Sequence, residues 1–217
     1  MTLAVETSSA RYAVALGAGD GVAFNSILDL PGDTSRDLAE LLARGLAACG
    51  GRAVDIEAIA VNIGPGSLGS LRDGVSFANG LAYALGRPVF PFTSFELIGR
   101  AAWRNTPVDT PVLCTRRANE GLAYAGVFDG ARVARMRFGK LEEIVPLVAG
   151  PGRRFSAAGS FRAETARLLA HAEVADSGVE TPDAVTMLQV GVRGRTPCDP
   201  LLSPAGPLNE RSAIFHD

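Results

Sequence analysis

The chain has 217 residues, enough for one large domain or two small ones with a sizeable hydrophobic core. Hydrophobic residues make up 47% and charged residues 20%, as in an ordinary soluble globular protein. The formal net charge of −2 argues against a broad electrostatic grip on nucleic acid or on an anionic membrane. Direct binding of nucleic acid would need a local basic patch, and the candidates are small: Arg116–Arg117 and Arg153–Arg154.

Cysteine usage and the N-terminus favour a soluble cytoplasmic protein. The three cysteines lie far apart, without a C-x-x-C pair, which is typical of reduced thiols. The first residues show no basic region ahead of an apolar core, so we expect no signal peptide. No apolar run approaches the ~20 residues that a membrane-spanning helix needs.

The first part of the chain predicts three strands followed by a helix. The strands are expected at 1–8, 12–16 and 22–30, and the first of them ends in three polar residues. A helix should follow over 34–49, where leucines recur on one face and charged residues lie on the other. This order indicates an antiparallel β-meander that leads into a helix.

The most informative stretch runs from 58 to 86. It begins with an apolar run, 58–61, that is typical of a buried strand. Gly64, Pro65 and Gly66 then break regular structure, and Ser67 is a good helix N-cap. Behind the cap, apolar residues recur at steps of three and four, which predicts one helix ending at Gly86: Leu68, Leu71, Val75, Ala78, Ala82 and Leu85.

This strand, glycine-rich turn and helix N-terminus could together bind an anion through free backbone N–H groups. The loop, however, lacks the Lys-Ser/Thr pair of a Walker P-loop and does not fit G-x-G-x-x-G. The residues alone favour the simpler alternative, in which the glycines only make a tight strand-to-helix turn. Arg72 and Asp73 follow on the helix, either as a solvated surface pair or as contacts for a ligand or partner at the loop.

The remainder of the chain repeats the opening pattern. A strand at 89–92 and a helix from about 94 to 103 complete the first half, and the polar, proline-containing segment 104–111 is the best candidate boundary. We therefore predict an N-terminal lobe at 1–104 and a smaller C-terminal lobe at 111–217. The later elements are expected as strands at 112–115, 122–128, 132–138 and 155–158, an apolar segment at 141–148, and helices at 161–171 and 182–192.

The sequence lacks the usual catalytic and metal-binding patterns. His171 and His216 are the only histidines, and neither has a second ligand at helical spacing, so we expect no metal site and no histidine-based triad. Glu6, Thr7 and Ser8 at a strand end could hold Mg²⁺-phosphate, but they are also ordinary turn formers. We expect no catalytic residue and no cofactor.

Several motifs resemble the TsaB/YeaZ family, a bacterial relative of TsaD that is sometimes labelled glycoprotease-like. They are the opening LAVETS, the repeated three-strand pattern and the GPGS stretch with its helix. The chain departs from the family pattern at Glu6, 68–70, Asp73 and 114–117. The matching positions are Gly64, Pro65, Gly66, Ser67, Leu71, Arg72, Gly74, Val75, Gly80, Leu81, Ala82, Pro88 and Ser94.

The resemblance implies an α/β fold of the actin-like (ASKHA) type, built from two ribonuclease-H-like lobes. It also implies a non-catalytic subunit that binds TsaD, the enzyme that transfers a threonylcarbamoyl group to adenosine 37 of tRNA. TsaE, an ATPase, would join through the complex, tRNA would be bound only indirectly, and no membrane would be involved. The motif loop would comprise Gly64, Pro65, Gly66, Ser67, Leu71, Arg72 and Gly74.

Two helices carry small residues that suggest where a partner docks. Helices 34–49 and 70–85 have Ala and Gly on parts of their surfaces, so they could join two partner helices in a four-helix interface. TsaD or a second copy of the chain, forming a homodimer, could use this surface. The alternative is that these residues pack only against their own sheet. The candidates are Leu38, Ala39, Ala43, Ala47, Val75, Ala78, Gly80 and Ala82.

Two rival functions stay open at this point. An ASKHA-type phosphotransferase or ATPase would use Glu6, Thr7 and the 64–67 loop, and the isolated chain would then hydrolyse nucleotide. A peptidase is suggested only by the older family label, and the sequence offers it no recognisable metal site or histidine triad.

Overall fold

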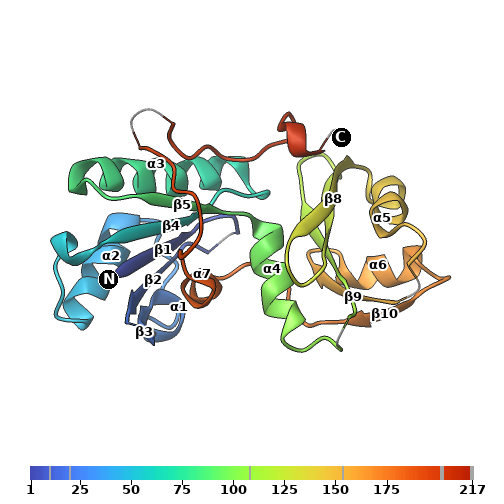
Figure 1. Ribbon diagram of the computed structural model, residues 1–217, viewed down its shortest axis with the longest axis horizontal. Helices are drawn as coiled ribbons and strands as arrows, with labels where there is room; N and C mark the ends of the chain where they lie inside the picture. Colours follow the sequence, from blue (N-terminus) through green and yellow to red (C-terminus); the bar gives the residue numbers. More distant parts are fainter. Residues whose placement is uncertain (10, 20, 108, 153, 201–202, 216–217) are drawn as a thin grey trace. The chain divides into compact units, whose positions relative to one another are not determined.

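The computed structural model describes residues 1–9, 11–19, 21–107, 109–152, 154–200 and 203–215 (Figure 1). The chain forms two compact units, one from Met1–Thr93 with Asp183–Pro207 and the other from Ser94–Pro182 with Leu208–Asp217. Each unit holds one mixed sheet of five strands with flanking helices. The predicted α/β fold of two actin-like lobes is thereby confirmed.

The first unit is built on a sheet with the strand order β3-β2-β1-β4-β5. β1 pairs antiparallel with β2 and parallel with β4, so a meander leads into parallel crossovers as predicted. Its strands are β1 (Thr2–Glu6), β2 (Ala13–Ala18), β3 (Gly21–Asn25), β4 (Ala58–Asn62) and β5 (Val89–Phe92). Its helices are α1 (Ser26–Asp29), α2 (Leu38–Ala48), the 3-10 turn η1 (Ala53–Asp55), α3 (Leu68–Leu85) and α7 (Ala184–Val190).

Two local predictions in this unit are wrong because side-chain caps intervene. The strand expected over 22–30 stops at Asn25, whose side chain accepts a hydrogen bond from the backbone N–H of Ile27 and so begins α1. The helix expected over 34–49 begins only at Leu38. The carboxylate of Asp37, just before it, accepts from two N–H groups of its first turn at 3.0 Å each.

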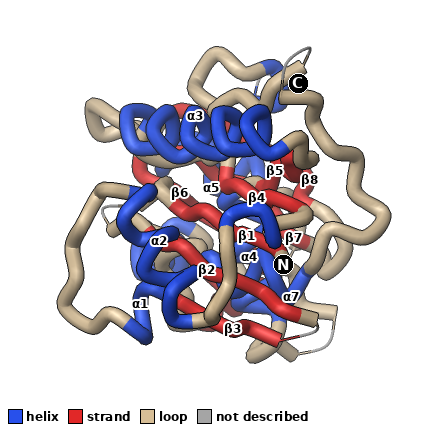
Figure 2. Tube along the Cα trace, turned by 90° about the vertical axis from the view of Figure 1, so that its left-hand side faces the viewer, coloured by secondary structure: helices blue, strands red, loops and turns tan. Residues whose placement is uncertain are grey.

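The apolar stripe of α3 faces the sheet, as its spacing predicts. Val75, Ala78 and Ala82 are at most 3% exposed and share one core with the leucines of α2 and with Val5 and Val61 of the strands. The helix ends at a C-cap glycine in the left-handed conformation. Helices α2 and α7 lie on opposite sides of strands β1 and β2 (Figure 2). One face of the sheet is therefore covered by α2 and α3, and the other by α7.

The second unit repeats this topology with the strand order β10-β9-β6-β7-β8. Its first strand again pairs antiparallel with its second and parallel with a later one. Its strands are β6 (Val112–Arg117), β7 (Ala123–Phe128), β8 (Val133–Gly139), β9 (Arg154–Gly159) and β10 (Glu173–Asp176). Its helices are α4 (Ser94–Trp103), α5 (Leu141–Ala149), α6 (Arg162–Leu168) and the 3-10 turn η2 (Ala213–Phe215).

The strand registers align the two sheets residue by residue. Thr2 lies opposite Ala58 in the first sheet, and Val112 lies opposite Ser156 in the second. Glu6 and Arg116 therefore occupy equivalent positions, at 1% and 5% exposure respectively. The duplicated fold thus carries a buried carboxylate in one unit and a buried guanidinium at the matching place in the other.

The two units differ from the predicted lobes 1–104 and 111–217 in two places. Helix α4 belongs to the second unit, because Phe95 and Ile98 pack into the core around Phe128. Residues 183–207 return to the first unit, where the backbone N–H of Cys198 donates to the carbonyl of Val89 at 2.7 Å. Polar and proline-rich composition marks the segment 104–111, of which Val108 lies outside the described residues, but long-range packing decides the division. None of the described helices is both long enough and apolar enough to cross a membrane.

Burial distinguishes one cysteine from the other two. Cys114 in β6 is fully buried, and this burial raises the pKa of its thiol, whereas Cys49 and Cys198 are partly exposed. Because the thiolate is the reactive form, we expect Cys114 to escape iodoacetamide in the native protein at about pH 8, while the other two are alkylated. Peptide mass spectrometry before and after denaturation measures this, and equal native labelling of Cys114 would contradict it.

Candidate functional site

The glycine loop 64–67 joins β4 to α3 and packs directly on the residues that follow β1. A Cβ atom placed on Gly66 would lie 2.6 Å from the carbonyl oxygen of Ser8. One placed on Gly74 would lie 2.9 Å from Cγ2 of Thr7 and closer still to its Oγ1. Both glycines are therefore required by close packing, which supports the interpretation of the loop as a tight strand-to-helix turn.

Beneath the loop lies a buried hydrogen-bond network centred on Glu6. One carboxylate oxygen accepts from both the backbone N–H and the hydroxyl of Ser8, each at 2.6 Å, and the other accepts from Nδ2 of Asn62 at 2.5 Å. Oδ1 of Asn62 in turn accepts from the N–H of Gly64 at 2.9 Å. Glu6, Ser8 and Asn62 are at most 2% exposed. We call Glu6, Ser8, Asn62 and Gly64 the Glu6 latch, because their hydrogen bonds connect the ends of β1 and β4 to the loop.

The latch bears on the sequence-based candidates in two ways. The carboxylate of Glu6 already serves three donors of its own unit, so a Mg²⁺-phosphate role would require the network to open. Asn62 is a site residue that the sequence reasoning misses, although its place directly after a buried apolar strand is an available signal. Within the described residues, no three His, Cys, Asp or Glu side chains are grouped closely enough to hold a metal ion.

The polar residues at the start of α3 make contacts that the sequence does not predict. Ser67 occupies the N-cap position, but its hydroxyl makes no capping bond and instead accepts from the hydroxyl of Ser70 at 3.2 Å. Asp73 is not simply a solvated partner of Arg72, because its carboxylate accepts from the hydroxyl of Tyr12 at 2.5 Å. Burial, followed by this bond to Asp73, raises the pKa of the Tyr12 hydroxyl.

The predicted partner-interface residues fall into two groups. Leu38, Val75, Ala78 and Ala82 are at most 5% exposed in the core of their own unit, so the prediction that they form an interface is wrong. On α3, the spacing of three and four residues places these side chains on the helix face that lies against the sheet. The other four are exposed: Ala39, Ala43 and Ala47 on α2, and Gly80 on α3.

Beyond Arg72, the exposed stripe of α3 carries small residues with one aromatic side chain beside them. Ser76, Gly80 and Ala84 are spaced four residues apart and are exposed, and a Cβ on Gly80 would meet no atom within 4 Å. Tyr83, beside them, is 62% exposed. We call Ser76, Gly80, Tyr83 and Ala84 the α3 face. It offers a surface that another helix could approach closely.

Of the two candidate basic patches, only Arg116–Arg117 lies wholly within the described residues, and it is not an intact surface feature. Arg116 is buried, whereas Arg117 is exposed and its guanidinium lies 4.6 Å from the ring centre of Phe161. Arg154 is paired with Glu173 at 3.1 Å. Arg153 and His216 lie outside the described residues.

Two mixed sheets of matching topology, with a glycine loop leading from the fourth strand into a long helix, define an actin-like α/β protein. The sequence model of the family described as TsaD, tRNA N6-adenosine threonylcarbamoyltransferase, matches residues 32–181. The chain belongs to this family.

Known relatives agree with this assignment. A tRNA N6-adenosine threonylcarbamoyltransferase of Thermus thermophilus is 41% identical over 63 residues, which cover 29% of this chain and 20% of that protein. The chain thus spans about a fifth of the length of this curated relative.

Solved structures extend the likeness to the whole fold. A Pseudomonas aeruginosa protein described as uncharacterized and similar to peptidase YeaZ superposes with a TM-score of 0.75 at 22% identity, over 97% of this chain and 99% of that one. YeaZ from Pseudomonas aeruginosa gives a TM-score of 0.67 at 22% identity, over 87% and 89% of the two chains. The predicted resemblance to the TsaB/YeaZ family is confirmed in the fold.

Proposed function

We propose that this chain is a non-catalytic, cytoplasmic subunit that binds a TsaD-type transferase and supports threonylcarbamoyl transfer to adenosine 37 of tRNA. The observation that carries the proposal is the Glu6 latch: the chain has the family's glycine loop, but the buried carboxylate beside it accepts hydrogen bonds from Ser8 and Asn62. A carboxylate bonded in this way stabilises the loop, and the transferase would catalyse the threonylcarbamoyl transfer. TsaE would join through the complex, and tRNA would be contacted through the transferase.

The exposed surfaces of α2 and α3 are the docking surface in this proposal. Ala39, Ala43 and Ala47 on α2 and the α3 face expose small side chains that let partner helices approach. Tyr83 supplies a large, rigid contact of the kind that dominates many interfaces. Because the surface could equally accept a second copy of the chain, transferase binding and self-association would compete.

A single substitution on α3 tests this docking surface. Gly80→Arg places a long charged side chain where nothing lies within 4 Å, so the fold has room for it but a docked helix does not. We expect affinity for the transferase to fall at least about tenfold, the equivalent of 1.4 kcal/mol. Isothermal titration calorimetry with the transferase from the same cell measures the change.

Two control variants make the result specific. Gly80→Ala keeps the surface smooth and should bind like the wild type, and so should Leu147→Arg, which alters a side chain 67% exposed on α5 of the second unit. Unchanged affinity of a folded Gly80→Arg variant would rule out this docking surface. Light scattering on the same proteins reports whether self-association uses it as well.

The role in the reaction needs its own assay. Threonylcarbamoyl transfer to tRNA should depend on this chain, and the isolated chain should hydrolyse no nucleotide. Hydrolysis by the chain alone, lost in Glu6→Ala but retained in a variant of an exposed carboxylate such as Glu57→Ala, would instead support an ASKHA-type ATPase.

A further inference from the structure

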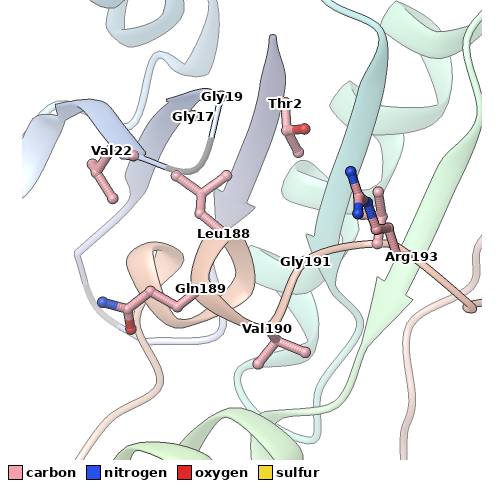
Figure 3. Close-up of a pocket in the computed structure, with 11 residues that line it drawn as sticks. Thr2, Gly17, Gly19, Val22, Leu188, Gln189, Val190, Gly191 and Arg193 are labelled. Carbon is pink, nitrogen blue, oxygen red and sulfur yellow. The ribbon is translucent and has the colours of Figure 1, made fainter.

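A cavity of about 380 Å³ lies in the first unit, between the β2–β3 hairpin and the end of α7 (Figure 3). It is separate from the Glu6 latch and from the α3 face, and none of the residues lining it belongs to the docking surface proposed above. Cavities of a few hundred cubic ångströms are of the size that holds small molecules.

The cavity has a fixed apolar wall. Leu188 projects from α7 toward Gly17 and Gly19, as Figure 3 shows. The missing side chain of Gly17 makes room for it, because a Cβ there would lie 3.2 Å from Cδ2 of Leu188. Val22 on the edge strand β3 is 43% exposed, and Val192 is half-buried. The side chain of Val190 points away from Leu188 and takes no part in this wall (Figure 3).

Arg193 lies in a hydrogen-bonded turn at the rim and is exposed. The N–H of Arg195 donates to the carbonyl of Val192 at 3.2 Å, which closes a turn with Arg193 inside it. Arg195 is itself anchored: its guanidinium lies 3.8 Å from the ring centre of Phe92 and donates to the carbonyl of Pro91 at 2.9 Å. The backbone of Arg193 is thus positioned before any ligand arrives.

Two polar side chains of the cavity are unengaged. In the described part of the chain, neither the guanidinium of Arg193 nor the hydroxyl of Thr2 has a hydrogen-bond or ion-pair partner. In the view of Figure 3, both lie on the side of Leu188 that is away from Val22. The cavity therefore combines a cationic, hydrogen-bonding end with an apolar end.

We propose that this cavity binds a small aliphatic carboxylate. A guanidinium offers a planar pair of donors that matches a carboxylate, and the Thr2 hydroxyl supplies another donor. The short hydrocarbon chain of the ligand would lie against Leu188 and Val22, where it leaves water. Neither a fully hydrated inorganic anion nor an aliphatic cation satisfies both ends.

The ligand class can be tested with matched small molecules on the full chain. Hexanoate is titrated into ¹⁵N-labelled protein while the amide signals of Gly17, Gly191 and Arg193 are followed by NMR. We expect saturable shifts below about 10 mM, the millimolar range open to a ligand of this size. Hexanamide keeps the chain but loses the charge, hexylamine reverses the charge, and acetate loses the chain. Each should bind at least about tenfold more weakly than hexanoate.

Substitutions in the cavity complete the test. Arg193→Gln should weaken hexanoate binding at least about tenfold, since a charge-assisted pair is lost, and Thr2→Val should weaken it by about threefold. Arg52→Gln removes an arginine that is 78% exposed elsewhere in the same unit and should change nothing. The proposal is overturned if hexanoate gives no saturable shifts, if acetate or hexanamide binds as well, or if Arg193→Gln binds like the wild type. Because no partner protein takes part, the outcome is independent of the proposed transferase complex.

Discussion

Gly74→Ala should lower the free energy of unfolding by about 2–3 kcal/mol, the range of an overpacked core site. The new methyl group would lie 2.9 Å from Cγ2 and 3.1 Å from Cβ of Thr7. Thr7 is fully buried and β-branched, so the rotation of its side chain is restricted. Helix α3 would have to move away from the end of β1 and would carry the glycine loop with it. Urea unfolding followed by far-UV circular dichroism measures the loss.

The same helix provides a matched control. Gly80→Ala makes the identical chemical change where no atom lies within 4 Å, and it should raise stability by about 0.5–1 kcal/mol through helix propensity. Opposite signs for the two variants would show that close packing, and not helix propensity, requires glycine at position 74.

Removing the obstructing side chain gives a second check. In the double variant Gly74→Ala with Thr7→Ala, the atoms nearest the new methyl group are gone, so the two effects should be non-additive by about 1 kcal/mol or more. Full additivity would mean that the destabilisation comes from some other contact of Gly74, and the packing argument would fail.

The sequence predicts best what local physics determines. The apolar stripe of α3 buries the same face of the helix that its spacing indicates, and Gly86 ends the helix as a left-handed cap. The meander and its repetition follow from short alternating runs and turns. These features need no knowledge of distant residues, because periodicity and turn chemistry are read within a few positions.

What the sequence does not predict depends on contacts across long separations. Strand β10 is short and polar, and it exists because it pairs in parallel with β9. Residues 183–207 join the first unit through contacts with residues more than 100 positions earlier in the chain. For example, Nδ2 of Asn79 donates to the carbonyl of Ala205 at 2.9 Å, although the two residues are 126 positions apart.

The same distinction between local and long-range determinants applies to the residues of the candidate site. The glycines of the loop stand out in the sequence, but their purpose depends on Thr7 and Ser8, more than 50 positions earlier. Asn62 does not stand out, because its partner Glu6 is 56 positions away. Small residues on α2 and α3 are all candidates for a surface, and only the packing shows which of them face the core.

Asn62→Asp should have the other large effect on stability. The substitution preserves shape and leaves an oxygen for the N–H of Gly64, but it replaces the donor that serves Glu6 at 2.5 Å with a second carboxylate. Two carboxylates in contact at 0–1% exposure cannot both stay ionised cheaply. We expect the free energy of unfolding to fall by about 3–4 kcal/mol at about pH 7, the range found when a buried charge loses its partner.

The pH dependence of Asn62→Asp identifies the cause. The pKa of the introduced carboxyl should be higher in the folded protein than in the unfolded chain, so the folded state binds more protons and loses stability as pH rises. At about pH 5 the protonated carboxyl can donate to Glu6 again, and much of the loss should be recovered. Asn119→Asp, at an exposed position, should change stability by less than about 0.5 kcal/mol at either pH.

These measurements also connect the Glu6 latch to the proposed function. If Asn62→Asp is equally destabilised at both pH values, the loss reflects packing and the latch is not the electrostatic element inferred from its hydrogen bonds. If stability returns at about pH 5 and transferase binding returns with it, the ordered loop and the start of α3 are needed for docking. Recovery of stability without recovery of binding would separate the two, because the docking surface farther along α3 would then depend on something other than the latch.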